Sequence, residues 1–218
     1  MNHFIFGGRH VLWLLTAAFA VAALTLVSSL ALGLETTSIE AGPLETSQEA
    51  LLLATMALYG WAAFDQRAAA RMASVGALTM AGIFFFRELE VPPTGALTTY
   101  LNSNAFRWHE TFVVLGIAIP YIVLRWRLMP TFIAYLRGFH TWPYVLVGLL
   151  LLTGDWLDGM EMATPHLATV IEEAAETLAY AVFALTGLHV LMAARAERPV
   201  AARFGESGDR HGPASPYA

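Results

Sequence analysis

The sequence predicts an all-α membrane protein, built as a bundle of six transmembrane helices. Hydrophobic residues make up 57% of the 218 residues and charged residues only 13%, whereas soluble domains carry about 25% charged residues. The mean hydropathy is +0.56. The apolar residues also fall in long blocks rather than in alternation, and this pattern is typical of helices surrounded by lipid.

Six apolar stretches define the predicted spans. They are 11–34, 50–64, 72–86, 111–124, 138–154 and 177–194. A helix needs about 20 residues to cross the hydrocarbon core. The first stretch is long enough alone, and the other five reach this length only if flanking charged residues lie within the membrane boundary. We expect a six-helix domain over residues 1–196, followed by a disordered cytoplasmic tail over 197–218 that is rich in Pro, Gly and charge.

The arginines predict the orientation of the chain. All 12 basic residues are Arg, and if the N-terminus is cytoplasmic, all but Arg87 and Arg107 lie on the cytoplasmic side. The 17 acidic residues sort the other way, since all but four of them fall outside. We therefore expect a multi-pass protein of the bacterial inner (cytoplasmic) membrane. Both termini would be cytoplasmic, and most acidic groups would lie at the outer face.

Two segments of the chain share one pattern. Residues 45–60 and 172–187 both read Glu-x3-Glu-x10-Gly, and each follows an acidic loop. This similarity indicates a duplicated helical hairpin, formed by spans one and two and again by spans five and six. The alternative is two unrelated helices that share an acidic first turn, which the helix dipole favours in any case.

Carboxylates recur at helical spacing near the predicted outer ends of the spans. Residues four apart share a helix face, so Glu45 pairs with Glu49 and Glu172 with Glu176. Only about 24 Å of helix separates Glu49 from Asp65, whereas the hydrocarbon core is about 30 Å thick. Glu49 is therefore expected below the outer surface. The same reasoning applies to Arg87, Glu88, Glu110 and Glu176.

Carboxylates at this depth predict a site for a cation or for protons. An acid at the membrane centre costs about 2.5–3.5 kcal/mol on insertion scales, so it usually faces the bundle interior and has a partner. Neighbouring carboxylates repel one another unless some are protonated, an arginine neutralises one, or a cation lies among them. Their oxygens suit divalent metal ions, and histidine can add an imidazole ligand. The expected ligands are Glu49, Glu88, Glu173 and Glu176, with Arg87 as charge partner, followed by Glu45, Glu110, Asp155, Asp158 and His109.

Three functions are compatible with such a site. The first is cation or proton binding for transport or metal handling, with a divalent metal ion as the implied cofactor. The second is a membrane-embedded, metal-dependent enzyme acting on lipid or quinone. The third is an accessory or assembly subunit, whose acids contact a membrane-protein partner or a second copy of the chain. A simpler interpretation is that the acids face water at helix N-termini.

Several other functional classes lack their usual signals. The chain has no cysteine, which excludes disulfides, thiolate metal sites and cysteine nucleophiles. It has neither a nucleotide-binding loop nor a basic groove for nucleic acid. Because no motif names a reaction, a role other than catalysis is favoured.

Overall fold

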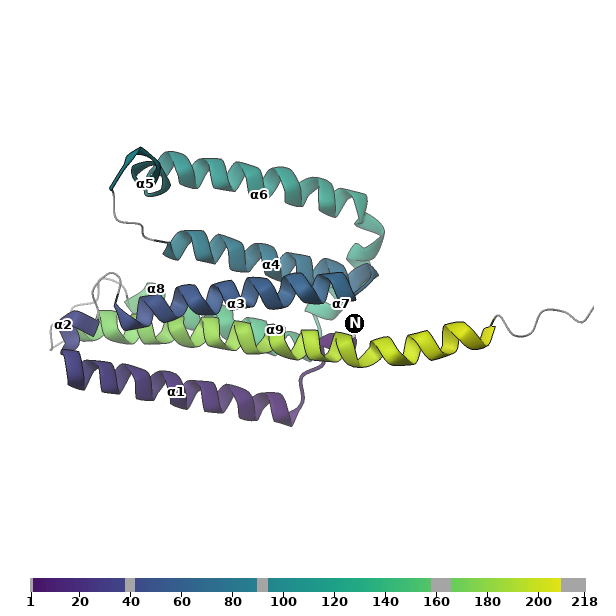
Figure 1. The fold of residues 1–218 in the computed structure, drawn as a ribbon, viewed down its shortest axis with the longest axis horizontal. Coiled ribbons are helices and arrows are strands. Elements are labelled where there is room, and N and C mark those ends of the chain that lie inside the picture. Colours follow the sequence, from purple (N-terminus) through teal and green to yellow (C-terminus); the bar gives the residue numbers. More distant parts are fainter. Residues whose placement is uncertain (1, 38–41, 90–93, 158–165, 209–218) are drawn as a thin grey trace, which may run out of the picture.

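The computed structural model describes residues 2–37, 42–89, 94–157 and 166–208 (Figure 1). Every regular element in these ranges is a helix. By length and composition, four segments could cross a membrane. They are α1 (Gly8–Leu32), α4 (Ala68–Glu88), α6 (Asn104–Leu124) and the Leu167–Ala196 part of α9 (Leu167–Gly208). The chain is therefore all-helical and has several helices suited to a bilayer.

Two further helices match the remaining predicted spans. They are α3 (Pro43–Asp65), with 23 residues, and α8 (Trp142–Leu157), with 16 residues. At about 1.5 Å per residue, α3 is long enough to cross but carries polar side chains, whereas α8 reaches only about 24 Å. The short elements are α2 (Leu34–Thr37), α5 (Ala96–Leu101), α7 (Met129–Leu136) and three 3₁₀ turns at Asn2–Phe4, Trp126–Leu128 and Phe139–Thr141. The count of six spans stays a prediction.

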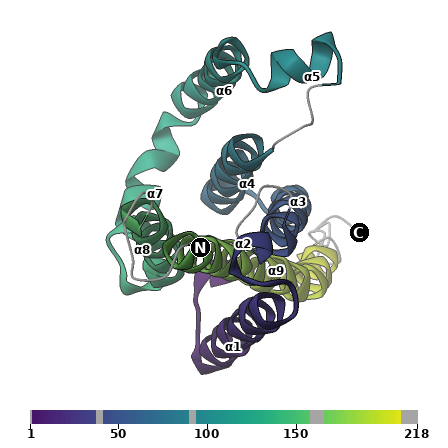
Figure 2. The ribbon, with the colours of Figure 1, turned by 90° about the vertical axis from the view of Figure 1, so that its left-hand side faces the viewer.

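The helix α9 forms the centre of the bundle (Figure 2). It packs against α1, α3 and α8, and α3 packs in turn against α4. Its inward side chains are almost completely buried, among them Tyr180, Val182 and Val190. At Gly187 an added Cβ would lie only 3.0 Å from Cε2 of Tyr59, so the absence of a side chain permits the close approach of α3 and α9.

The helices α3 and α9 are parallel, and residues at similar distances from their N-terminal ends face each other. Near their N-terminal ends Gln48 contacts Glu173, and further along Tyr59 lies opposite Gly187. These are the two helices that carry the shared Glu-x3-Glu-x10-Gly pattern. This parallel packing is compatible with a duplicated hairpin but is not required by one, and the duplication itself stays a prediction.

The helix α6 stands apart from the rest of the bundle. None of its residues is buried. Figure 2 shows α6, α7 and α8 forming an arc around one side of α4. The inner side of this arc encloses a cavity, described below.

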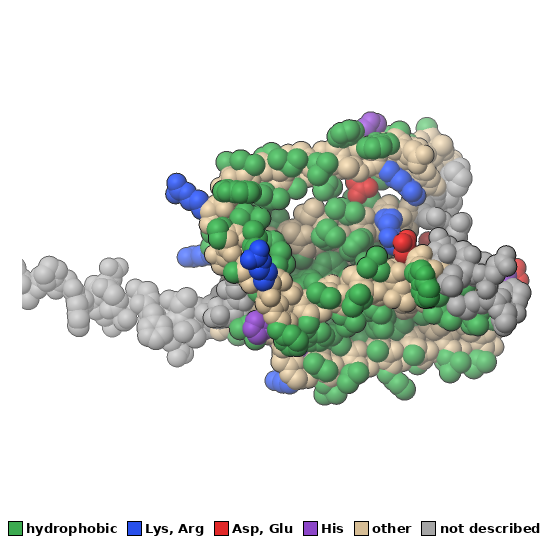
Figure 3. Space-filling model, turned by 180° about the vertical axis from the view of Figure 1, so that it is seen from behind, with side chains coloured by type: hydrophobic (Ala, Val, Ile, Leu, Met, Phe, Trp, Pro, Cys, Tyr) green, Lys and Arg blue, Asp and Glu red, His purple; other side chains and the backbone are tan. Residues whose placement is uncertain are grey.

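The two ends of the bundle differ in charge. In Figure 1, α2 and α5 lie at one end, which we call the α5 end, and α7 lies at the other, the α7 end. Figure 3 shows hydrophobic side chains over much of the face between them, with arginines projecting at the α7 end. The helix α9 continues to Gly208. The disordered tail over 197–218 stays a prediction. Residues 209–218 lie outside the described ranges.

A carboxylate–arginine cluster at the α5 end

The cluster forms where the last turn of α4 meets the first turns of α9. Arg87 and Glu88 are the final two residues of α4. Glu176 and Tyr180 lie four residues apart on α9, so they project from one face of that helix. Because α4 and α9 run in opposite directions, these two pairs of side chains come together at the α5 end.

Charge-assisted hydrogen bonds join the two helices. The Arg87 Nη2 group donates to Oε1 of Glu176 at 2.9 Å, and its Nε donates to Oε1 of Glu88 at 2.9 Å. The Tyr180 hydroxyl donates to the same Glu88 oxygen at 2.7 Å. Such bonds to ionised partners are stronger than neutral ones, so they fix the C-terminal end of α4 against α9.

The cluster is buried unevenly. Glu176 is 9% exposed as a whole residue, and the side chain of Glu88 is 15% exposed. The Arg87 side chain is 47% exposed and therefore lies on the solvent-accessible side of the cluster, which we call its mouth. On the other side, α8 approaches closely: a Cβ added to Gly154 would lie 3.1 Å from Cγ of Glu176. The glycine leaves the space that the Glu176 side chain occupies.

A second acid on α9 is held by α3. Gln48 is fully buried, and its Nε2 group donates to Oε2 of Glu173 at 2.6 Å and to the Glu173 carbonyl oxygen at 3.2 Å. Since both partners are acceptors, the amide NH₂ must point toward Glu173. The Gln48 Oε1 atom is then buried without a hydrogen-bond partner among the described residues. A buried acceptor in this state is costly unless a donor or a cation reaches it.

Negative charge exceeds positive charge in this region. Glu173 experiences repulsion from Glu45, Glu172 and Glu88. Glu176 experiences repulsion from Glu88, Glu173 and Glu172, and attraction from Arg87. The acids of α3, α4 and α9 therefore act on one another, and Arg87 is the cation that pairs with two of them. This arrangement can take up a proton or a cation.

The structure brings together four of the predicted residues: Arg87, Glu88, Glu173 and Glu176. Glu45 acts on Glu173 from the start of α3. The Glu49 side chain is half-buried and forms neither a hydrogen bond nor an ion pair with any described residue.

The remaining candidates lie elsewhere or are not described. On α6, the Nδ1 atom of His109 is 2.7 Å from the Tyr100 hydroxyl, and Glu110 lies near Arg107. Asp155 is exposed on α8. Asp158 lies outside the described residues. Across the described ranges, no group of three or more His, Asp and Glu side chains is placed to hold a metal ion.

Three residues of the cluster are absent from the sequence-based site: Gln48, Gly154 and Tyr180. Tyr180 follows Glu176 by four residues and Gln48 follows Glu45 by three, so helical spacing alone could have included both. Nothing in the sequence distinguishes Gly154 from the other glycines of the spans. Comparison with models of protein families, with curated proteins and with solved structures found no match to this chain.

Proposed function

We propose that this chain is a multi-pass inner-membrane protein whose carboxylate–arginine cluster binds a cation or protons and serves transport or metal handling. One observation carries the proposal. Glu176 is almost completely buried and pairs with Arg87 across two helices, while Glu88 and Glu173 repel it from nearby. An excess of acids over bases in a place of low dielectric constant favours the uptake of positive charge.

In this proposal the Arg87 side chain occupies the cation site when no proton or external cation is bound. Its guanidinium neutralises Glu88 and Glu176, yet its side chain is half-exposed at the mouth of the cluster. A cation or proton that reaches the two carboxylates would replace the guanidinium, which would turn toward water. The unpaired Gln48 Oε1 atom beside Glu173 offers a further oxygen ligand.

The proposal includes the predicted topology. The helices α3 and α8 also cross the membrane, so that six spans place both termini in the cytoplasm. The α7 end, with Arg71 and Arg125, then faces the cytoplasm in agreement with the preference of arginine for that side. The carboxylate–arginine cluster opens outward.

The test compares charge-neutralising variants in proteoliposomes. Proton flux is followed with a trapped pH-sensitive dye under an imposed potential, and Mn²⁺ binding is measured by electron paramagnetic resonance. We expect the unaltered protein to be active in one of these assays. Glu176→Gln and Glu88→Gln should each reduce the signal at least tenfold. The matched control is Glu35→Gln, at an exposed acid of α2 at the same end, and it should keep the full signal.

Two outcomes would contradict the proposal. One is an unchanged signal in both Glu176→Gln and Glu88→Gln, and the other is no flux and no binding in the unaltered protein. The second outcome would favour an assembly subunit if another membrane protein co-purifies with the chain. The observation behind this second function is that α6 is mostly apolar from Phe112 to Leu124 but has no buried residue, so this part of the helix can contact lipid or a partner.

A further inference from the structure

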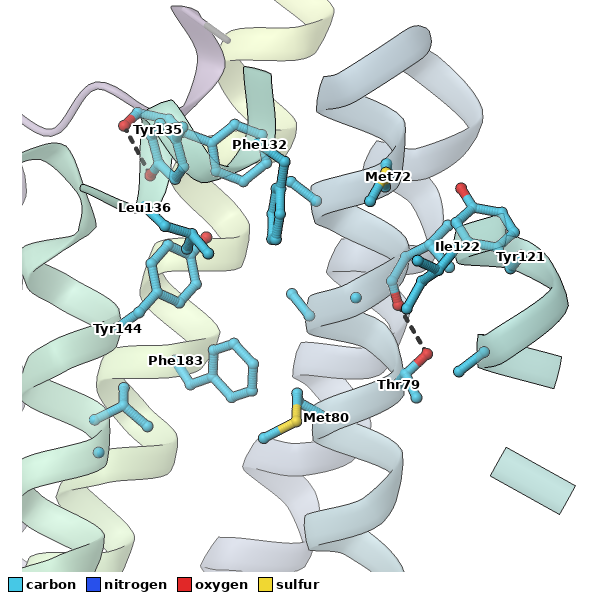
Figure 4. Close-up of a pocket in the computed structure, with 18 of the residues that line it drawn as sticks. Met72, Thr79, Met80, Tyr121, Ile122, Phe132, Tyr135, Leu136, Tyr144 and Phe183 are labelled. Carbon is cyan, nitrogen blue, oxygen red and sulfur yellow. Dashed lines mark hydrogen bonds between the residues drawn. The ribbon is translucent and has the colours of Figure 1, made fainter. Parts of the chain in front are cut away.

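A cavity of about 510 Å³ is lined by residues of α4, α6, α7, α8 and α9 (Figure 4). Its wall includes Met80 and Phe84 of α4, Ile117 of α6, Phe132 of α7 and Phe183 of α9. Figure 4 shows Phe183 and Met80 pointing toward one another from opposite walls. The volume falls within the range of about 300–1,000 Å³ that is typical of pockets for small molecules.

The polar atoms of the wall are mostly engaged elsewhere. The Thr79 hydroxyl donates to the Val75 carbonyl at 2.9 Å, and the Tyr144 hydroxyl lies 3.0 Å from that of Tyr59. The Tyr135 hydroxyl donates to the carbonyl oxygens of Phe4 and His140. A wall of this kind offers water few hydrogen-bond partners and so favours an apolar occupant. Only the Tyr121 hydroxyl, among the wall groups described, is buried without a partner, so it can meet one polar atom of an occupant.

The cavity is long and runs parallel to the helices. On α4 its wall extends from Met72 to Phe84, which is about 18 Å of helix at 1.5 Å per residue. The wall residues Ala73, Gly76, Met80 and Phe84 recur every three or four positions and form a stripe along the helix. In a bundle that crosses the bilayer, the long axis of such a cavity is parallel to the lipid chains.

We propose that this cavity binds the hydrocarbon chain of a membrane lipid, which lies parallel to α4. An elongated, apolar cavity matches an extended hydrocarbon chain in both shape and chemistry. The hydrocarbon chain of the lipid can enter beside α6, because this helix has no buried residue and does not pack closely against the rest of the bundle. This site is separate from the carboxylate–arginine cluster, although the centroids of the Phe84 and Tyr180 rings are 6.0 Å apart.

Two glycines in the wall provide the variants for a test. Gly76 on α4 and Gly148 on α8 both line the cavity, and an added Cβ at either position would meet nothing within 4 Å. A leucine at these positions therefore fills the cavity without a clash at Cβ. Gly116 on α6 is the matched control, since its Cβ would also meet nothing within 4 Å and it does not line the cavity.

The full chain is labelled in membranes with two photoreactive probes. One is a phosphatidylethanolamine with a diazirine in its acyl chain, and the other is a ubiquinone analogue with a diazirine in its isoprenoid tail. Mass spectrometry then locates the labelled residues. We expect labelling around Met80, Phe84 and Phe183 that falls at least fivefold in Gly76→Leu and in Gly148→Leu. Labelling in Gly116→Leu should stay within twofold of the unaltered protein.

The two probes show which kind of lipid supplies the hydrocarbon chain. Labelling by the phospholipid probe identifies an acyl chain, and labelling by the quinone probe alone identifies an isoprenoid tail. If both cavity variants fail to insert, competition by excess unlabelled lipid on the unaltered protein decides. The proposal is overturned if neither probe labels the wall, or if labelling there is unaffected by competition and by the variants.

Discussion

Arg87 contacts two carboxylates at once, and this double role sets the cost of removing it. Its partners are Glu88, its neighbour on α4, and Glu176 on α9. Without the guanidinium, Glu176 would stay almost fully buried beside another acid and lack its ion-pair partner. Breaking such a pair from one side is costly, whereas removing both charges together is much less so.

Arg87→Ala should therefore lower the free energy of unfolding by about 1–3 kcal/mol, the range for an unsatisfied buried group, reduced here by the exposure of the arginine. The double variant Arg87→Ala/Glu176→Ala should be more stable than Arg87→Ala alone, because it leaves no unpaired charge on α9. Thermal unfolding of the detergent-solubilised protein measures both. Equal losses in the single and double variants would mean that the ion pair contributes little.

The acids of the cluster could be selected from the sequence, but their actual partners could not. Helical spacing and estimated depth identify Glu88 and Glu176 as buried acids in need of partners. Helical spacing places Gln48 and Tyr180 on the same faces as these acids, but which acid each of them contacts becomes apparent only once α3, α4 and α9 are placed side by side. The half-buried Glu49 shares the spacing and depth of Glu176 and yet has no ion-pair partner among the described residues.

At the level of helices, close contact between α3 and α9 depends on a glycine. The Gly187 backbone faces the fully buried ring of Tyr59, whose hydroxyl lies 3.0 Å from that of Tyr144 on α8. The space left at Gly187 thus admits the Tyr59 ring between α3 and α9, and the Tyr59 hydroxyl reaches α8. In lipid such close packing matters, because apolar side chains gain little by turning away from hydrocarbon that is equally apolar.

Gly187→Leu should separate α3 from α9 and lower the free energy of unfolding by about 1–3 kcal/mol, as is usual when a packed core is overfilled. The physical reason is that even the first added carbon would lie 3.0 Å from the Tyr59 ring. Chemical unfolding in mixed micelles measures the change. Gly116→Leu, where the added Cβ meets nothing within 4 Å, serves as the control. A loss of similar size in both variants would contradict this explanation.

The helix boundaries differ from the apolar stretches for a clear reason. The apolar stretch 50–64 begins directly after Glu49, but α3 starts at Pro43 and so includes Glu45 and Glu49. Proline suits the first helical position, and acids stabilise the first turn, so the helix extends past its apolar part. The apolar pattern therefore locates the helices and underestimates the lengths of α3, α4, α6 and α9, whereas α8 begins at Trp142, four residues after the start of its stretch.

At the scale of the whole molecule, the sequence predicts helices but not their neighbours. Nothing in it marks α9 as the central helix or α6 as the one without buried residues. In water, a polar face shows which side of a helix is exposed. In lipid, the outward side is as apolar as the core, so periodicity does not identify the packed face.

The predicted topology can be tested on the whole chain because it contains no cysteine. A single cysteine at Asn104, an exposed position at the α5 end, reports on one side of the membrane, and one at Ser215 reports on the C-terminus. In cells whose outer membrane has been made permeable, a maleimide that does not cross the inner membrane should label Asn104→Cys. Ser215→Cys should react only after the inner membrane is opened. The reverse result would place the carboxylate–arginine cluster on the cytoplasmic side. Labelling at both positions would put both on the outer side, which requires an even number of spans between them instead of the predicted three.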